Sequence, residues 1–193
     1  MILIVAGVSG SGKTTVGSML AERLHWRFAD ADDFHPAANI AKMRAGIPLT
    51  DGDRWPWLRA VAAWMDERIE QGESAVIACS VLKRSYRDVL LDGRPEARLV
   101  LLTVDRERLA RRLAARHGHF FPVQLLNSQL DTLEPLQADE RAVAVVESGD
   151  PADTVAAIVA AVWPGGGPGP GASGAPAAPG ASGAPGGDHE AET

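Results

Sequence analysis

Residues 7–14 read Gly7-Val8-Ser9-Gly10-Ser11-Gly12-Lys13-Thr14 and match the pattern G-x-x-x-x-G-K-[ST] at every position. The glycines let the backbone wrap closely enough for successive N–H groups to point at phosphate oxygens. A helix that begins at Lys13 adds the positive end of its dipole. We expect Lys13 to reach the β- and γ-phosphates, the Thr14 hydroxyl to hold Mg²⁺ and Thr15 to belong to the same nucleotide site. The stretch therefore predicts binding of ATP with Mg²⁺.

Apolar runs and helical periodicities alternate on both sides of this loop. Short apolar runs predict five strands, at residues 2–6, 26–29, 74–79, 98–104 and 142–146. Helical spacing predicts helices at residues 13–24, 35–45, 54–70, 83–91, 106–116, 121–134 and 153–162. The alternation predicts an α/β fold of three layers, in which helices cover both faces of a parallel five-stranded sheet. Ligand loops then gather at the carboxyl ends of the strands.

The end of the chain has a different composition. Residues 164–193 contain ten glycines and six prolines, and Gly-Ala-Ser-Gly-Ala-Pro occurs at 171–176 and again at 180–185. Such a segment buries too little apolar surface to offset the entropy lost on ordering. We therefore predict one folded domain over residues 1–163 and a disordered tail over residues 164–193.

Composition excludes several classes of protein. The net charge of −6 argues against a general nucleic-acid binder. No apolar run approaches the ~18 residues that span a bilayer, and the first residues lack the basic flank of a signal peptide. The single cysteine, Cys79, fits a reducing cytoplasm and is expected to be a packed thiol. These features predict a cytoplasmic protein with no nucleic-acid and no membrane partner.

An acidic segment, Asp30-Ala31-Asp32-Asp33-Phe34-His35-Pro36, follows the second predicted strand and should face the phosphate loop. In an extended segment Asp30 and Asp32 lie on one side and Asp33 on the other. Phosphoryl transfer uses a carboxylate that takes the proton of the acceptor hydroxyl. We assign that role to Asp32 and place Asp30 in the metal shell through water. The alternative is a solvated acidic loop, and for Asp33 we prefer a cap of the helix that begins near Pro36.

Four further motifs make a resemblance specific. They are Asp-x-Asp-x-x-His-Pro at 30–36, Asp-x-Asp-Arg at 51–54, Cys-Ser-x-Leu-Lys-x-x-Tyr-Arg-Asp at 79–88 and Arg-His-Gly-His-Phe-Phe at 116–121. Together with the phosphate loop, the chain resembles the small P-loop gluconokinases, relatives of shikimate kinase, over most of residues 3–150. The resemblance implies a P-loop kinase fold, transfer of the γ-phosphoryl group of ATP to the 6-hydroxyl of D-gluconate, and a homodimer.

An acidic polyol as acceptor agrees with the basic residues near the predicted strand ends. Its carboxylate needs Arg or Lys, and its hydroxyls need mixed donors and acceptors. We expect Asp32, His35, Arg54, Lys83 and Arg87 to bind it, with Lys83 and Arg87 one helical turn apart on a shared face. The alternatives are a solvated helix face and pairing of Arg54 with Asp51 or Asp53. Lys42 is expected at the surface or as a partner of Asp51 or Asp53.

The arginine-rich segment 106–121 is typical of a mobile lid that closes over the phosphates and excludes water. Arg112 and Arg116 are four residues apart, and we expect both to reach the nucleotide. The other arginines are expected to be solvated or paired with Glu107, and Asp105 is expected to cap the helix.

Two alternatives stay open at this point. The first alternative is a different small-molecule kinase, of the shikimate type for example. The second is a nucleotide-dependent regulator without acceptor chemistry. An acceptor site in which Asp32 faces basic side chains favours an enzyme, because a pure nucleotide binder has no need of one.

Overall fold

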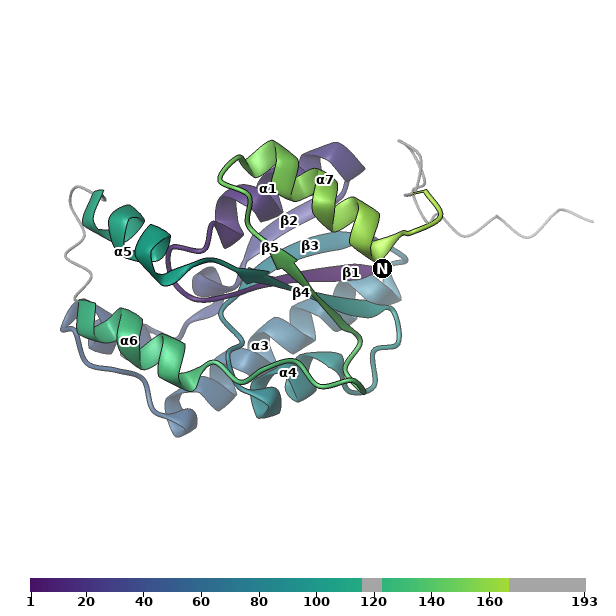
Figure 1. Ribbon diagram of the computed structural model, residues 1–193. Helices are drawn as coiled ribbons and strands as arrows, with labels where there is room; N and C mark the ends of the chain where they lie inside the picture. Colours follow the sequence, from purple (N-terminus) through teal and green to yellow (C-terminus); the bar gives the residue numbers. More distant parts are fainter. Residues whose placement is uncertain (116–122, 167–193) are drawn as a thin grey trace, which may run out of the picture.

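The computed structural model describes residues 1–115 and 123–166, and within them five parallel strands form one sheet (Figure 1). The strands are β1 (Ile2–Ala6), β2 (Arg27–Asp30), β3 (Ala75–Cys79), β4 (Ala97–Thr103) and β5 (Ala142–Val146). Their spatial order is β2-β3-β1-β4-β5, which places β1 at the centre. In register, Ile2 lies opposite Ala75 of β3 and Ala97 of β4. The predicted α/β fold is confirmed.

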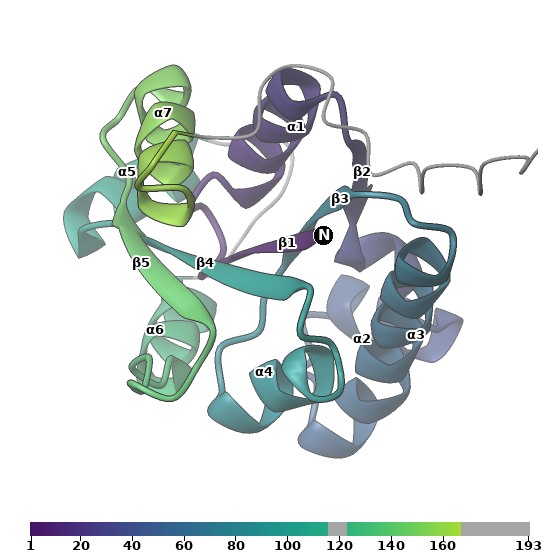
Figure 2. The ribbon, with the colours of Figure 1, turned by 90° about the vertical axis from the view of Figure 1, so that its right-hand side faces the viewer.

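Helices cover both faces of this sheet (Figures 1 and 2). On one face lie α1 (Lys13–Leu24) and α7 (Pro151–Val162), and on the other lie α3 (Asp51–Glu70) and α4 (Arg84–Leu91). The alternation of β1 explains both layers, because successive side chains of a strand point to opposite faces. Ile2 and Ile4 pack in the core beneath α3 and α4, and Leu3 and Val5 pack beneath α1 and α7. The central strand is therefore apolar throughout.

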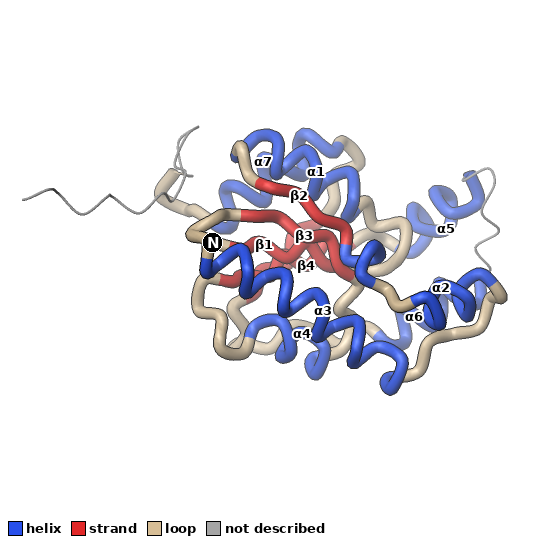
Figure 3. The backbone as a smooth tube through the Cα atoms, turned by 180° about the vertical axis from the view of Figure 1, so that it is seen from behind, coloured by secondary structure: helices blue, strands red, loops and turns tan. Residues whose placement is uncertain are grey.

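Three further helices lie beyond the carboxyl ends of the strands (Figure 3). They are α2 (Ala37–Arg44), α5 (Arg106–Ala115) and α6 (Val123–Thr132). A 3₁₀ turn, η1 (Ala31–Phe34), links β2 to this end of the molecule. The loop between β1 and α1 opens at the same end, so the topology brings the phosphate loop and the acidic segment together.

Two helix starts differ from the prediction. The helix predicted at 35–45 begins at Ala37, because η1 takes up the residues before it. The helix predicted at 54–70 begins at Asp51, because Thr50 and Asp53 form a reciprocal capping box at its start. The remaining elements agree to within two residues, except that residues 116, 121 and 122 of the predicted lid helices lie outside the described residues.

The described part of the chain extends to residue 166, three residues past the predicted boundary. Trp163 follows α7 and packs edge-on against Trp26, with ring centroids 6.0 Å apart. Residues 167–193 lie outside the described residues, so the division at residue 163 stays a prediction. Cys79 is buried, as expected of a packed thiol, and this burial raises its pKa. None of the described helices combines the length and apolar character needed to cross a bilayer.

Candidate functional site

The phosphate loop has the backbone geometry of an anion-binding turn. Gly7 has φ 148°, and a Cβ added there would lie 2.7 Å from Ser11 Oγ and 2.9 Å from the Leu102 carbonyl oxygen. Gly12, at φ 90°, is the residue before α1, and no side chain in the described part of the chain caps that helix end. The first N–H groups of α1 therefore point into the loop with the positive end of the helix dipole behind them. This arrangement suits a phosphate group.

The side chains of the loop point to the same conclusion. The Lys13 ammonium lies within the turn and donates to the Val8 carbonyl at 3.0 Å. The Ser11 hydroxyl is buried and has no hydrogen-bond partner among the described residues. Thr14 Oγ1 donates to Asp30 Oδ2 at 2.7 Å, so the two residues predicted to serve Mg²⁺ are adjacent.

This pair fits the metal it was predicted to serve. A hydroxyl and a carboxylate are hard oxygen donors, and Mg²⁺ in kinases combines one or two such protein ligands with waters and phosphate oxygens. No group of three acidic, histidine or cysteine side chains able to hold a metal occurs in the described ranges. The set is thus too small to hold a metal alone and suits one that arrives with a nucleotide.

The acidic segment is folded differently from the extended strand that was predicted. Residues 31–34 form η1, and the Asp30 carboxylate accepts the Asp32 N–H at 3.1 Å and so caps this turn. The prediction that Asp33 caps α2 is wrong, because Pro36 precedes α2 and no described side chain caps that end. The capping carboxylate is therefore Asp30, at the start of η1, and not Asp33 at the start of α2.

Asp32 lies in η1 with its side chain 76 % exposed, and the charge of Lys13 in the phosphate loop acts on it. Desolvation by the surrounding chain and then the charge of Asp30 raise its pKa, and the charge of Lys13 opposes them. A carboxylate that is accessible and made more basic by its neighbours is suited to accept a proton from a bound hydroxyl.

His35 lies beside Asp32 and is held in place by stacking. Its ring is parallel to that of Trp57 within 13°, with centroids 4.4 Å apart, and its Nε2 is 3.9 Å from Asp32 Oδ1. Burial and then the positive charge of Arg54 lower the pKa of His35 to about 4. The imidazole is therefore neutral at neutral pH.

A second polar cluster joins the starts of α3 and α4. Lys83 donates to both oxygens of Asp51 at 2.8 and 2.9 Å, and the Tyr86 hydroxyl donates to Asp51 at 2.6 Å. The Arg54 guanidinium lies 5.8 Å from the centre of the Tyr86 ring. The structure thus brings Arg54 and Lys83 together around Tyr86, and the field of Arg54 extends to His35.

Lys42 pairs with Asp53, one of the two partners proposed for it. Its ammonium lies 2.7 Å from Asp53 Oδ1, and the Thr50 N–H also donates to Asp53. These hydrogen bonds, that of Lys42 first, lower the pKa of Asp53 to about 2. The pair secures the start of α3, the helix that carries Arg54.

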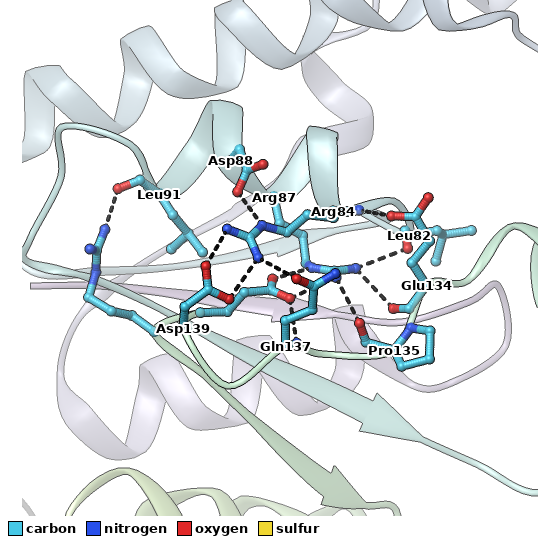
Figure 4. A network of polar contacts seen from close by, with 11 residues as sticks. Leu82, Arg84, Arg87, Asp88, Leu91, Glu134, Pro135, Gln137 and Asp139 are labelled. Carbon is cyan, nitrogen blue, oxygen red and sulfur yellow. Dashed lines mark hydrogen bonds and ion pairs between the residues drawn. The ribbon is translucent and has the colours of Figure 1, made fainter.

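Arg87 does not join this cluster. Its side chain is 0 % exposed and pairs with Glu140, which is 1 % exposed. Its remaining donors reach the main-chain carbonyls of Leu82, Glu134 and Pro135 (Figure 4). This burial contradicts the prediction that Arg87 binds the substrate. Lys83 and Arg87 do not share a face either, because Lys83 is the residue before α4 and has extended backbone.

The arginines of α5 contact the end of β5. Arg112 donates to Glu147 at 2.8 Å, and Arg108 lies 3.3 Å from the same buried carboxylate. An Arg112 nitrogen lies 3.9 Å from the point where a Cβ on Gly12 would stand, so Arg112 borders the phosphate loop. Arg116, its predicted companion, lies outside the described residues. Arg111 pairs with Glu107, and Asp105 accepts the Arg108 N–H as the predicted cap.

Sequence reasoning missed one residue at the loop. Gln129, on α6, accepts the Ser9 N–H at 2.7 Å and donates to the Ser9 hydroxyl at 3.1 Å. The two residues are 120 positions apart, and no local pattern marks Gln129.

Known proteins resemble this chain over most of its length. The family described as shikimate kinase matches residues 9–156. A probable gluconokinase of Xenopus tropicalis is 48 % identical over 160 residues, which cover 75 % of this chain and 84 % of that protein. The gluconokinase of Gluconobacter oxydans is 48 % identical over 143 residues, covering 74 % and 80 %. The crystal structure of a gluconokinase from Sinorhizobium meliloti superimposes with a TM-score of 0.75 at 44 % identity, covering 84 % of this chain and 91 % of that one.

Proposed function

This chain belongs to the shikimate kinase family and to its gluconokinases, and we propose that its site transfers the γ-phosphoryl group of ATP to the 6-hydroxyl of D-gluconate. The products are 6-phospho-D-gluconate and ADP. The observation that carries the proposal is the position of Asp32. The charge of Lys13 in the phosphate loop acts on its carboxylate, and Nε2 of His35 lies 3.9 Å from its Oδ1.

The nucleotide half of the site is the phosphate loop with its neighbours. The N–H groups of residues 7–15 cradle the phosphates, except those of Ser9 and Ser11, which donate to Gln129 and Val8. Lys13 neutralises charge on the migrating group. Thr14 and Asp30 would hold Mg²⁺, the latter through water, and the ion supplies charge neutralisation on the phosphates. Arg112 borders the loop and is assigned to the nucleotide, as is Arg116 on sequence grounds alone.

The acceptor half is built around Asp32. This carboxylate orients the acceptor hydroxyl and takes its proton. We assign Arg54 to the substrate carboxylate, with Lys83 beside it, because a cation over an aromatic ring still presents its edge to an anion. His35 contacts a hydroxyl. Arg87 is not part of this set, because its guanidinium bonds Glu140 and the main chain of residues 134 and 135, which precede β5.

An acceptor screen tests the proposal. ADP formation is measured with MgATP and gluconate, other aldonates, gluconolactone, shikimate or nucleoside monophosphates. We expect ADP to form with gluconate and not without an acceptor. Faster ADP formation with shikimate than with gluconate would support a shikimate-type kinase instead. Nucleotide binding without any acceptor-dependent turnover would support a nucleotide-dependent regulator.

Asp32 has a matched control in its neighbour. Asp32→Asn keeps the shape but removes the base, so kcat should fall by roughly 10²–10⁴ while MgATP affinity stays within a few-fold. Asp33→Asn makes the same change of charge one residue away and should leave turnover largely intact. The opposite ranking of the two variants in steady-state assays would remove Asp32 from the proposed role.

The cellular location and the oligomeric state are proposed from the sequence. We retain a cytoplasmic location and a homodimer as proposals, the second supported by the resemblance alone. Size-exclusion chromatography with light scattering tests the dimer directly.

A further inference from the structure

A buried amide on α2 faces the ring of His35. Asn39 is 3 % exposed, and its Nδ2 lies 2.8 Å from the main-chain carbonyl oxygen of Asp53. A carbonyl oxygen only accepts hydrogen bonds, so the nitrogen end of the carboxamide must be the end that faces Asp53. The start of α3 therefore fixes the orientation of the Asn39 side chain.

The same nitrogen also lies 3.3 Å from His35 Nδ1. Because Nδ2 is a donor, Nδ1 must be the acceptor, and in a neutral imidazole the proton then sits on Nε2. Which ring nitrogen carries the proton is thus decided by Asn39 and not by the solvent.

The ring itself has little freedom to escape this arrangement. It stacks on Trp57, and the Trp57 indole N–H donates to the Ala31 carbonyl at 2.6 Å, one residue before Asp32. The protonated Nε2 consequently faces Asp32 Oδ1 across 3.9 Å, too far for a good direct hydrogen bond. A hydroxyl placed between them would accept from His35 and donate to Asp32, which fixes its rotation.

We propose that Asn39 is a positioning residue that holds His35 in the Nε2–H tautomer, so that the acceptor hydroxyl meets one donor and one base. This inference rests on the proposed function for its catalytic consequence, but the tautomer itself exists without any substrate. In the other tautomer, Nε2 and Asp32 would both present lone pairs, and a single hydroxyl proton would satisfy only one of them.

The tautomer is measured by ¹⁵N NMR of the imidazole rings at neutral pH without substrate. The chain has five histidines, and the signals of His35 are those that disappear in His35→Gln. We expect a protonated Nε2 and an unprotonated Nδ1. A protonated Nδ1 in the unmodified protein would overturn the proposal, whether or not gluconate is the substrate.

Asn39→Asp replaces the donor by an acceptor of the same shape. Nδ1 should then acquire a proton, giving either the other tautomer or an imidazolium that pairs with Asp32, and both weaken the pairing of one donor with one base. We expect kcat to fall ~10-fold, which corresponds to the loss of about one net hydrogen bond in the transition state, with KM for ATP unchanged. The chain's other asparagine offers the matched control: Asn127 Oδ1 accepts from Arg106, and Asn127→Asp keeps that acceptor and should keep kcat. A protonated Nδ1 with unchanged kcat in Asn39→Asp would refute the positioning role.

A second pair of variants serves if Asn39→Asp does not fold. A glutamine at position 35 carries its N–H donor near the place of Nε2 and has no tautomer to set. Asn39→Ser should lower kcat several-fold in the natural sequence and by less than twofold in the His35→Gln background. Equal losses in both backgrounds would show that Asn39 acts on structure alone.

Discussion

Removing the Arg87 guanidinium separates a structural role for this residue from a role in substrate binding. Arg87→Met keeps much of the side-chain volume and deletes the charge. The change leaves the Glu140 carboxylate, 1 % exposed, without its buried partner, and removes the donors that reach the carbonyls of Leu82, Glu134 and Pro135.

Breaking a buried pair in this way costs about 3–5 kcal/mol, mainly because an unpaired charge stays buried. For a domain of this size the melting temperature should fall by roughly 6–20 °C. Arg84 provides the control on the same helix. Its ion pairs with Asp88 and Asp139 are partly exposed to solvent, whereas that of Arg87 is fully buried, so Arg84→Met should cost about 1 kcal/mol.

The assay is urea unfolding followed by tryptophan fluorescence, with KM for gluconate measured on the folded fraction. Arg87→Met/Glu140→Leu should recover part of the lost stability, because it no longer buries a lone carboxylate. An Arg87→Met protein of normal stability whose KM for gluconate rises tenfold or more would refute our reasoning and restore Arg87 to the substrate site.

Three further outcomes are expected. Lys13→Ala should abolish turnover in an ADP-release assay by removing the charge that follows the migrating phosphoryl group, and near-normal turnover would contradict the nucleotide site. Deletion of residues 165–193 should leave the melting temperature and activity nearly unchanged, because Trp163 is the last residue with a described packing contact; a large loss of folded protein would show that the tail docks. His35 should make stability rise with pH between about 4 and 6.5, since the unfolded chain takes up a proton there that the native ring refuses. The free energy of unfolding, measured by chemical denaturation across that range, should rise less steeply with pH in His35→Gln than in the unmodified protein. An unchanged slope of this free energy against pH would mean that His35 does not titrate as described.

The sequence predicted those parts of the site that depend on neighbours in the chain. The phosphate loop, its strand and its helix form one local pattern, and the Asp105 cap is equally local. Arg87 was misassigned because its partner, Glu140, lies 53 residues further along the chain. The residues next to Arg87 in the sequence do not indicate that its side chain is buried. The start of α3 was placed late because Thr50 and Asp53 resemble ordinary loop residues until their side chains are seen to bond each other. Asp33 was given a cap because an extended segment was assumed where the chain makes a 3₁₀ turn.

The position of β1 at the centre of the sheet has a consequence for how the protein is made. Ile2 is translated before its partners in the sheet, Ala75 and Ala97, which lie 73 and 95 positions later in the chain. Pairing over such separations is slow, because a long stretch of chain must lose its freedom before any contact forms. The phosphate loop at the end of β1 is thus translated before the two strands that hold β1 in place. A nascent chain stalled before residue 97 should be unable to retain ATP, and nucleotide binding should appear only once β4 has emerged.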